Sequence, residues 1–267
     1  MDLRKEREIN HYDKLARGWQ AKVTVHPKLA LLDIEAINVM RMSSYQFLYK
    51  LLKRYVPGKK VLDYGCGHGM HSIQIAKMGA KEVIGIDLSE ESLKIAEERR
   101  MKYEVSNVRF TKMDAEALEF PDNFFDIVFD GGTFSSIELE KGLQEIHHIL
   151  KPGGLLIGIE TLGHHPLANL KRWLNKKRGV RTFWAAAHIM KMGDLGLAKK
   201  YLDLEQIHFF HFVSLLTIPL QRLPGSRAAC RIANGIDKIL FKIFPSLKKY
   251  AFKAVFVFSK NAKPQGD

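Results

Sequence analysis

The sequence predicts an α/β protein built on a doubly wound, mostly parallel β-sheet. Between residues 59 and 160, short β-rich runs alternate with segments of helical pattern. The predicted strands are apolar along their length, which is typical of strands buried on both faces. Closely spaced glycines in VLDYGCGHGMHS (61–72) follow the first strand, at the edge where open parallel sheets bind their ligands.

Each element of this alternation has its own signal. The strands are short apolar runs, and the helices between them have amphipathic patterns. Ser89 is a suitable N-cap for the helix that follows it, and Glu90 and Glu91 favour the first turn of that helix. KPGG (151–154) supplies a turn. The predicted strands are 60–64, 82–87, 108–114, 124–132 and 155–160, and the predicted helices are 70–79, 89–104 and 138–150.

The flanking segments are less regular. Residues 1–56 are expected to be helical, and 166–203 to be helical and basic. The apolar run HFFHFVSLLTIPL (208–220) predicts a core strand, and AFKAVFVFSK (251–260) predicts a last strand. Between these two strands, 227–244 places apolar residues at helical spacing with four basic residues among them.

Composition limits the class of protein. The chain has 267 residues, of which 46% are hydrophobic, so it can bury a large core. Cys66 and Cys230 form neither a disulfide framework nor a CxxC metal pair, which favours a reducing, cytoplasmic setting, and no metal site is expected. The sequence shows no signal-peptide core and no apolar run long enough for a membrane span.

The net charge of +13 is unevenly distributed. Residues 161–267 hold 19 Lys and Arg against 5 Asp and Glu, which suggests that this part meets something acidic; the alternative is a solvated basic surface. KRWLNKKRGVR (171–181) can bind a phosphate, an anionic lipid surface or RNA, although it lacks the interleaved aromatics of a stacking platform. The helix at 227–244 either packs on the sheet edge or lies on acidic lipid.

The glycine loop predicts the charge of its ligand. Gly65, Gly67 and Gly69 depart from the dinucleotide fingerprint, whose third glycine would fall at Met70. The loop contains no Lys or Arg, and Asp63 precedes it, so a pyrophosphate would be repelled. A ligand with a cationic part fits better. S-adenosylmethionine carries a sulfonium, an ammonium and one carboxylate, and no phosphate.

Two further carboxylates extend this prediction. Asp87 ends the second strand, 22 residues after Gly65, where an acid can accept both ribose hydroxyls. Asp114 ends the third strand and can accept the adenine amino group, with Met113 against the ring. The structural alternatives are that Asp63 caps a turn and that Asp87 caps the second helix.

Four motifs in order carry a family resemblance. VLDYGCGHG, GIDLS, MDAEALEFPDNFFDIVF and EIHHILKPGG resemble the class I, Rossmann-like S-adenosylmethionine-dependent methyltransferases over residues 58–160. The resemblance implies a seven-stranded sheet whose last strand, AFKAVFVFSK, is antiparallel and inserts between strands five and six. It also implies helical insertions after strands five and six.

The resemblance also implies roles for individual residues. HYDKLARGWQ (11–20) resembles a segment folded over the cofactor, so Tyr12 is a candidate lid residue. Cys66 is expected to be a buried filler and not a nucleophile. The implied cofactor contacts are Asp63, Gly65, Cys66 and Gly67 at the methionine end, Asp87 and Leu88 at the ribose and adenine, Asp114 and Ala115 over the adenine, and Asp130 or Gly131 beneath the methionine.

The acceptor side is less specific. Residues 130–134 lack the prolines typical of enzymes that methylate base amino groups. His164 and His165 follow the fifth strand and are candidates for a general base; the alternative is that one caps the next helix and the other is exposed. The candidate walls of the acceptor pocket are Phe134, Trp173 and Trp184.

Together these features predict an S-adenosylmethionine-dependent methyltransferase that acts on O or N of a small molecule, anionic or membrane-associated, and releases S-adenosylhomocysteine. The alternatives are an RNA methyltransferase that uses the basic half and a non-catalytic cofactor-binding regulator. The expected organisation is a lid segment at 1–56 and a methyltransferase domain at 57–267, with insertions at 164–203 and 219–249. The expected location is the cytoplasm, with a possible place at the membrane periphery.

Overall fold

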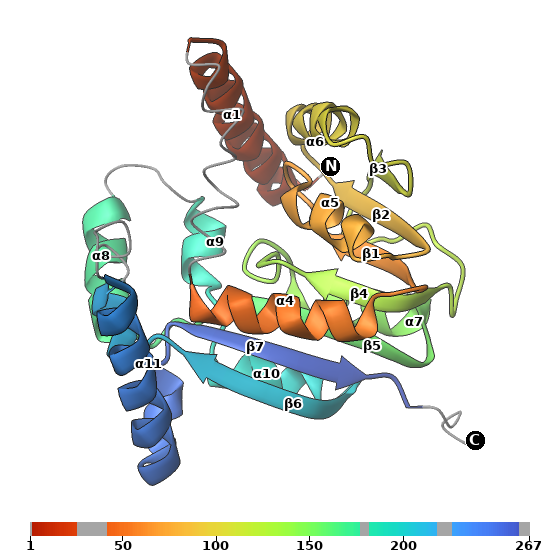
Figure 1. Ribbon diagram of the computed structural model, residues 1–267. Coiled ribbons are helices and arrows are strands. Elements are labelled where there is room, and N and C mark those ends of the chain that lie inside the picture. Colours follow the sequence, from red (N-terminus) through yellow and green to blue (C-terminus); the bar gives the residue numbers. More distant parts are fainter. Residues whose placement is uncertain (1, 26–41, 177–181, 218–225, 262–267) are drawn as a thin grey trace.

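The computed structural model of the protein, which describes residues 2–25, 42–176, 182–217 and 226–261, is built around one seven-stranded sheet (Figure 1). The strand order across the sheet is β3-β2-β1-β4-β5-β7-β6. The strands are β1 (Lys60–Tyr64), β2 (Glu82–Asp87), β3 (Val108–Lys112), β4 (Phe125–Asp130), β5 (Leu150–Thr161), β6 (Asp203–Phe210) and β7 (Lys253–Ser259).

The sheet topology confirms the predicted fold class. Strands β1 to β5 run parallel to one another, whereas β7 lies between β5 and β6 and runs antiparallel to both. Lys253 at the start of β7 therefore pairs with Thr161 at the end of β5. This end of β7 stands at the carboxyl edge of the parallel strands.

Helices cover both faces of the sheet. One core lies between the sheet and α7 and α10, around Tyr64, Phe125 and Phe256; the other lies against α4 and α5, around Leu48 and Phe129 (Figure 1). The helices are α1 (Leu3–Val25), α4 (Ser43–Tyr55), α5 (Met70–Lys77), α6 (Glu90–Lys102), α7 (Leu139–Ile149), α8 (Pro166–Lys176), α9 (Phe183–Ala187), α10 (Met192–Ala198) and α11 (Ser226–Ile243), with 3-10 turns η1 (Ser214–Thr217) and η3 (Pro245–Tyr250).

Most helices and strands between residues 60 and 160 begin and end within a few residues of their predicted bounds. The Ser89 hydroxyl accepts from the backbone N–H of Ser92 at 3.0 Å, so Ser89 is the N-cap of α6 as expected. The predicted turn at 151–154 instead lies within β5, where the pairing with β4 shifts register between Phe125 and Ile127. Gly153, with φ of 75°, allows this irregularity.

The sixth strand differs from its prediction. β6 ends at Phe210, and the part of the predicted strand at 214–217 is the 3-10 turn η1. His211 has φ of 64°, which ends the extended backbone, and the buried Asp237 carboxylate on α11 accepts backbone N–H groups of the turn that follows. β6 is also a partly exposed edge strand and not a core strand. Residues 218–220 of the prediction lie outside the described residues.

Candidate functional site

The glycine loop after β1 has a backbone that few other residues could adopt. Gly65 and Gly67 have φ of 71° and 51°, in the left-handed region that favours glycine. A Cβ on Gly65 would lie 2.2 Å from Thr133 Oγ1, so the close approach to the β4 loop also requires glycine. A Cβ on Gly67 would meet nothing within 4 Å. The second glycine therefore leaves its backbone open to a ligand.

A cavity of about 840 Å³ opens at this loop. It lies beyond the carboxyl ends of β1, β2 and β4, where open α/β sheets bind their ligands, and α1 covers it. The lining combines Glu8, Ile9, His11, Tyr12, Lys14, Leu15, Gly18 and Trp19 of α1 with Asp63, Gly65, Cys66, Gly67, His68, Met70, His71, Ile86, Asp87, Leu88, Ser89, Ser92, Met113, Ala115, Gly131, Gly132, Thr133, Ser136 and Ile137.

The cavity brings together most of the residues that were predicted to hold the cofactor. The predicted residues in its lining are Tyr12, Asp63, Gly65, Cys66, Gly67, Asp87, Leu88, Met113 and Ala115. Asp114 lies outside the lining, and its carboxylate contacts the Lys5 ammonium. Asp130 is fully buried and accepts from the backbone N–H of Thr133 at 2.9 Å, while the neighbouring Gly131 lines the cavity.

Asp87 holds the glycine loop against the start of α6. One carboxylate oxygen accepts the backbone N–H of Gly67 at 2.9 Å, and the other accepts that of Ser89 at 2.9 Å. Burial raises the pKa of this carboxyl, and the backbone N–H groups partly offset that rise. A carboxylate has about four acceptor positions, so Asp87 can still accept hydroxyl donors from a ligand in the cavity. Ser89, and not Asp87, caps α6.

Asp63 and Cys66 are both buried beside the loop. The Ser72 hydroxyl donates to the Asp63 carboxylate at 2.5 Å. Burial raises the pKa of Asp63 to about 7, and the charge of Asp87 adds to the rise. Burial also raises the pKa of the Cys66 thiol well above its usual range, so this thiol is a poor nucleophile near neutral pH.

The charge of the lining favours a cationic ligand. Glu8, Asp63 and Asp87 line the cavity, and Lys14 is the only Lys or Arg among its described lining residues. Carboxylates that are buried without a counter-ion gain from a nearby positive charge, whereas a phosphate would be repelled. The cavity can therefore hold a sulfonium or ammonium compound more readily than a dinucleotide.

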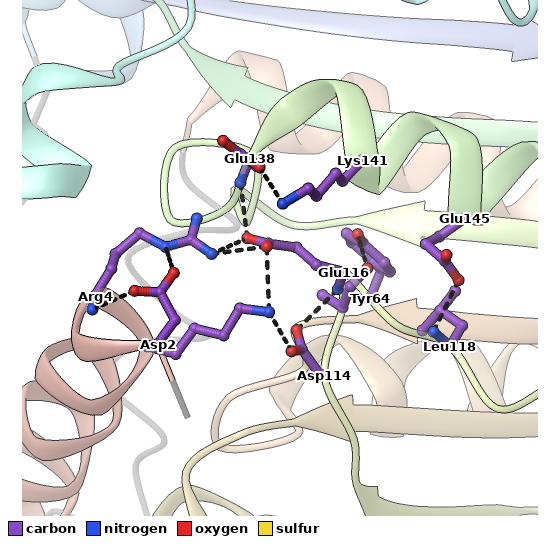
Figure 2. Close-up of polar contacts among 11 residues, drawn as sticks. Asp2, Arg4, Tyr64, Asp114, Glu116, Leu118, Glu138, Lys141 and Glu145 are labelled. Carbon is purple, nitrogen blue, oxygen red and sulfur yellow. Dashed lines mark hydrogen bonds and ion pairs between the residues drawn. The ribbon is translucent and has the colours of Figure 1, made fainter.

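Helix α1 is fixed over the cavity at several points. The hydroxyls of Tyr12 and Ser136 lie 3.1 Å apart, and the Ser89 hydroxyl donates to Asp13 at 2.6 Å. Figure 2 shows the start of the helix, where Arg4 pairs with Glu116. Within the predicted lid segment, α1 thus lies above the glycine loop with Tyr12 facing the cavity, whereas α4 packs on the sheet in the second core.

Glu8 is one of the lining residues that the sequence analysis did not assign to the site. Glu8 lies one helical turn before Tyr12, and neither of its buried carboxylate oxygens has a hydrogen-bond partner in the described structure. Burial raises its pKa, and the nearby Thr182 hydroxyl offsets part of the rise. The i, i+4 spacing from Tyr12 was the available signal, but an acidic residue in a charged helix usually faces solvent.

His71, in the first turn of α5, is another lining residue that the sequence analysis did not assign to the site. Its ring stacks on Tyr45 with centroids 5.9 Å apart, and its Nδ1 lies 2.7 Å from the Tyr49 hydroxyl. Burial lowers the pKa of His71 to about 4, so the ring is neutral near pH 7. Tyr49 lies on α4, and nothing in the sequence between the two residues indicates that they meet.

The histidines predicted as a general base lie elsewhere. His165 is buried, donates from Nε2 to the backbone carbonyl of Phe212 at 3.0 Å, and accepts the N–H of Ala168 on Nδ1 at 3.4 Å. It caps α8, which was the structural alternative for one of the pair. His164 is half-buried and is absent from the described cavity lining.

The three aromatic residues predicted to wall the acceptor pocket also lie outside the described lining. Phe134 is buried in the core and stacks on Phe256, because the chain turns at Gly132 and directs the next residues back to the sheet. Trp173 is 67% exposed on α8. Trp184 stacks on His188 with centroids 3.7 Å apart.

Comparison with known proteins agrees with this geometry. The family model described as a methyltransferase domain matches residues 56–203. The chain is 36% identical over 125 residues to phosphoethanolamine N-methyltransferase 2 of Caenorhabditis elegans, covering 45% of this chain and 29% of that protein. It is 39% identical over 107 residues to the ubiquinone/menaquinone biosynthesis C-methyltransferase UbiE of Yersinia pestis, covering 39% of this chain and 43% of that protein.

A solved structure shows the same fold. Phosphoethanolamine N-methyltransferase 2 of Haemonchus contortus, in complex with S-adenosylhomocysteine, superposes with a TM-score of 0.56 at 20% identity, over 82% of this chain and 53% of that one. The two curated relatives are covered to 29% and 43% of their own length, so the chain spans less than half of each of them. The family match, the motifs and the sheet order lead to one conclusion: this chain belongs to the class I, Rossmann-like family of S-adenosylmethionine-dependent methyltransferases.

Proposed function

We propose that this protein transfers a methyl group from S-adenosylmethionine to an oxygen or nitrogen of a small-molecule acceptor. The observation that carries the proposal is the cavity at the glycine loop, which is lined by three carboxylates and covered by α1. A sulfonium cofactor neutralises such a lining, and a helical cover excludes the water that would compete with an acceptor.

The residues of the cavity fit the cofactor in two groups. Asp87, Leu88, Met113 and Ala115 provide an acidic acceptor and apolar surface for the adenosine part. Asp63 and the open backbone of Gly67 suit the charged methionine part. When bound, the cofactor supplies an electrophilic methyl group on sulfur. The acceptor lone pair forms the new bond to carbon as the carbon–sulfur bond breaks, which leaves S-adenosylhomocysteine.

The protein then has to align the acceptor and receive its proton. Alignment of the reacting atoms accounts for much of the rate of such a displacement. Glu8 and His71 are two candidates in the lining to take that proton, because the buried Glu8 carboxylate has no hydrogen-bond partner among the described residues and the His71 ring is neutral near pH 7. A well-placed base contributes about 10²–10⁴-fold in rate.

The size and cover of the cavity favour a small acceptor. Its volume lies towards the upper end of the range for a ligand site, which leaves room beside the cofactor for a small second molecule. The names of the two curated relatives, which concern phosphoethanolamine and quinones, support a small-molecule acceptor in this chain as well. A polymer such as RNA would have to displace α1 to reach the loop.

Thermal unfolding with added ligands tests the cofactor. S-adenosylmethionine and S-adenosylhomocysteine should raise the midpoint of unfolding, and NAD should not. Asp87→Ala should abolish the rise, whereas the control Asp203→Ala, at the exposed start of β6, should retain it. Stabilisation by NAD alone would disprove the proposed cofactor.

A labelling experiment tests the acceptor class. The protein is incubated with methyl-labelled S-adenosylmethionine and a cell extract separated into small-molecule, lipid, protein and RNA fractions. Label in the small-molecule or lipid fraction is the expected outcome. Label confined to RNA or protein would overturn the acceptor class, and cofactor binding without any transfer would favour a non-catalytic regulator.

A further inference from the structure

Helix α11 carries an exposed stripe of isoleucines. Ile232, Ile236, Ile239 and Ile243 are 65%, 41%, 59% and 60% exposed. Their spacing of four, three and four residues places them on one face of the helix. Phe244, which follows α11 in the chain, is 54% exposed. Leu216, on the turn η1 that contacts α11, is 60% exposed, and both add apolar surface beside the helix. A continuous exposed apolar face of this kind marks an interaction site.

The stripe is not the face by which α11 packs on the protein. Ala233 and Phe241 are buried on another side of the helix. On that side the buried Asp237 carboxylate accepts the backbone N–H of Val213 at 2.7 Å, and Asn234 accepts from the Ser43 hydroxyl at 2.8 Å. The helix is therefore anchored to the domain while its isoleucines face outward.

Basic residues occupy a second exposed face of the same helix. Arg231, Lys238 and Lys242 are exposed and follow one another at helical spacing. The only acidic residue in the sequence of α11 is Asp237, whose side chain points to the domain. The surface thus combines aliphatic side chains with uncompensated positive charge, which is the composition of helices that lie in a membrane interface.

A second helix near this surface has similar exposed side chains. Leu167, Leu170 and Trp173 of α8 are 46%, 55% and 67% exposed. The two helices are linked, because His165 before α8 contacts Phe212, and Phe212 packs on Phe241 of α11. Tryptophan is enriched where proteins meet lipid headgroups. α8 and α11 also appear at the same end of the sheet in Figure 1.

We propose that the isoleucine stripe and basic face of α11 form a docking surface for an anionic lipid bilayer. The isoleucines enter the acyl region, and the lysines and arginine remain with the acidic headgroups. Among the described residues, the helices include no candidate for a membrane span. The proposal does not depend on methyl transfer.

The positive charge of this surface favours an anionic bilayer as its binding partner over a second copy of the same chain. A twofold contact through the stripe would bring the same helix of both copies together, with Arg231, Lys238 and Lys242 of each facing like charges. The whole region 161–267 has an excess of basic residues, 19 against 5 acidic, which an anionic surface would complement. The surface lies at the carboxyl edge of the parallel strands, the edge at which the cavity opens.

Vesicle flotation tests the apolar face. The wild-type protein should bind vesicles of phosphatidylcholine mixed with phosphatidylserine, and bind pure phosphatidylcholine vesicles weakly. The double variant Ile236→Ser with Ile239→Ser should lose about tenfold or more in binding. Its matched control is Met101→Ser on α6, which removes an apolar side chain that is 58% exposed elsewhere. All variants should keep the wild-type midpoint of thermal unfolding, since the side chains face solvent.

A second pair of variants tests the charge. Lys238→Gln with Lys242→Gln should weaken binding to the anionic vesicles by roughly tenfold. The control pair, Lys59→Gln with Lys81→Gln, removes two exposed lysines at the opposite edge of the sheet and should bind as wild type. Equal binding to both vesicle types, or isoleucine variants that bind normally, would overturn the proposal. So would a dimer that the isoleucine variants dissociate, or RNA binding that the lysine variants remove while vesicle binding persists.

Discussion

The guanidinium of Arg4 donates to the carboxylate of Glu116, with 2.7 Å between Nη2 and Oε2 (Figure 2). Glu116 follows β3, and its side chain is only 3% exposed. It also accepts the backbone N–H of Glu138, before α7, at 2.8 Å. One carboxylate therefore joins the start of the covering helix to two loops of the domain.

This contact predicts the effect of Glu116→Gln on cofactor release. Without the negative charge, Arg4 loses a charge-assisted partner and the start of α1 is held less firmly. S-adenosylhomocysteine should then dissociate roughly 5–30-fold faster, which corresponds to about 1–2 kcal/mol. Stopped-flow fluorescence would measure the rate, since Trp19 lines the cavity. In Glu82→Gln, which loses partly exposed ion pairs with Lys60 and Arg109 far from α1, the rate should not change.

The glycine loop predicts unequal effects of two similar substitutions. Gly65→Ala imposes a positive φ on alanine and drives its Cβ into Thr133, whose hydroxyl is held by the Tyr64 carbonyl at 2.7 Å. We expect a loss of about 2–4 kcal/mol of unfolding free energy. Gly67→Ala adds only the strain of a positive φ, so it should lower the unfolding free energy by about 1 kcal/mol. Its methyl group would stand in the cavity and should weaken cofactor binding. Urea titration and calorimetry measure the two quantities, and equal losses of stability would contradict the geometry.

Asp63 predicts how cofactor affinity depends on pH. The pKa of Asp63 is about 7 in the folded protein and 3.8 as the ordinary value. The folded state therefore holds a proton that the unfolded state has lost, so the free energy of unfolding falls as pH rises from about 4 to about 7. A cation bound beside it favours the carboxylate, lowers its pKa and releases a proton. Affinity for S-adenosylmethionine should therefore fall below about pH 7, by at most about tenfold for each pH unit.

Calorimetry across the range from acidic to mildly alkaline pH measures this dependence. Asp63→Asn should bind more weakly above pH 7 and show a flatter profile. A wild-type affinity that stays constant across the interval would show that the bound cation does not reach this carboxylate. A profile unchanged in Asp63→Asn would assign the proton to a different group.

Glu8 predicts opposite effects on stability and on activity. None of the described residues hydrogen-bonds to its buried carboxylate, so Glu8→Gln should stabilise the ligand-free protein by about 1 kcal/mol. If Glu8 receives the acceptor proton, labelling of the fraction that wild type methylates should fall by about 10²-fold or more. Glu6→Gln, on the exposed side of the same helix, is the control for both measurements. Full activity in Glu8→Gln would leave His71 as the base to test.

The fold and the cofactor side of the cavity could be predicted because their signals are local. Apolar runs mark strands buried on both faces, and glycines mark backbone that must turn with positive φ. Parallel strands bring their carboxyl ends to one edge, so residues that follow β1, β2 and β3, such as Gly67, Asp87 and Met113, meet there without further information.

The rest depended on contacts between distant parts of the chain. The sequence by itself determined the strand–helix alternation, the glycine positions and the acidic strand ends, since each depends on residues a few positions apart. Only the tertiary structure decided that β6 ends at Phe210, where Asp237 of α11 accepts the next N–H groups, that Asp114 pairs with Lys5 outside the cavity lining, and that Glu8 faces the cavity. Burial and pairing of such groups are set by packing, which no local pattern encodes.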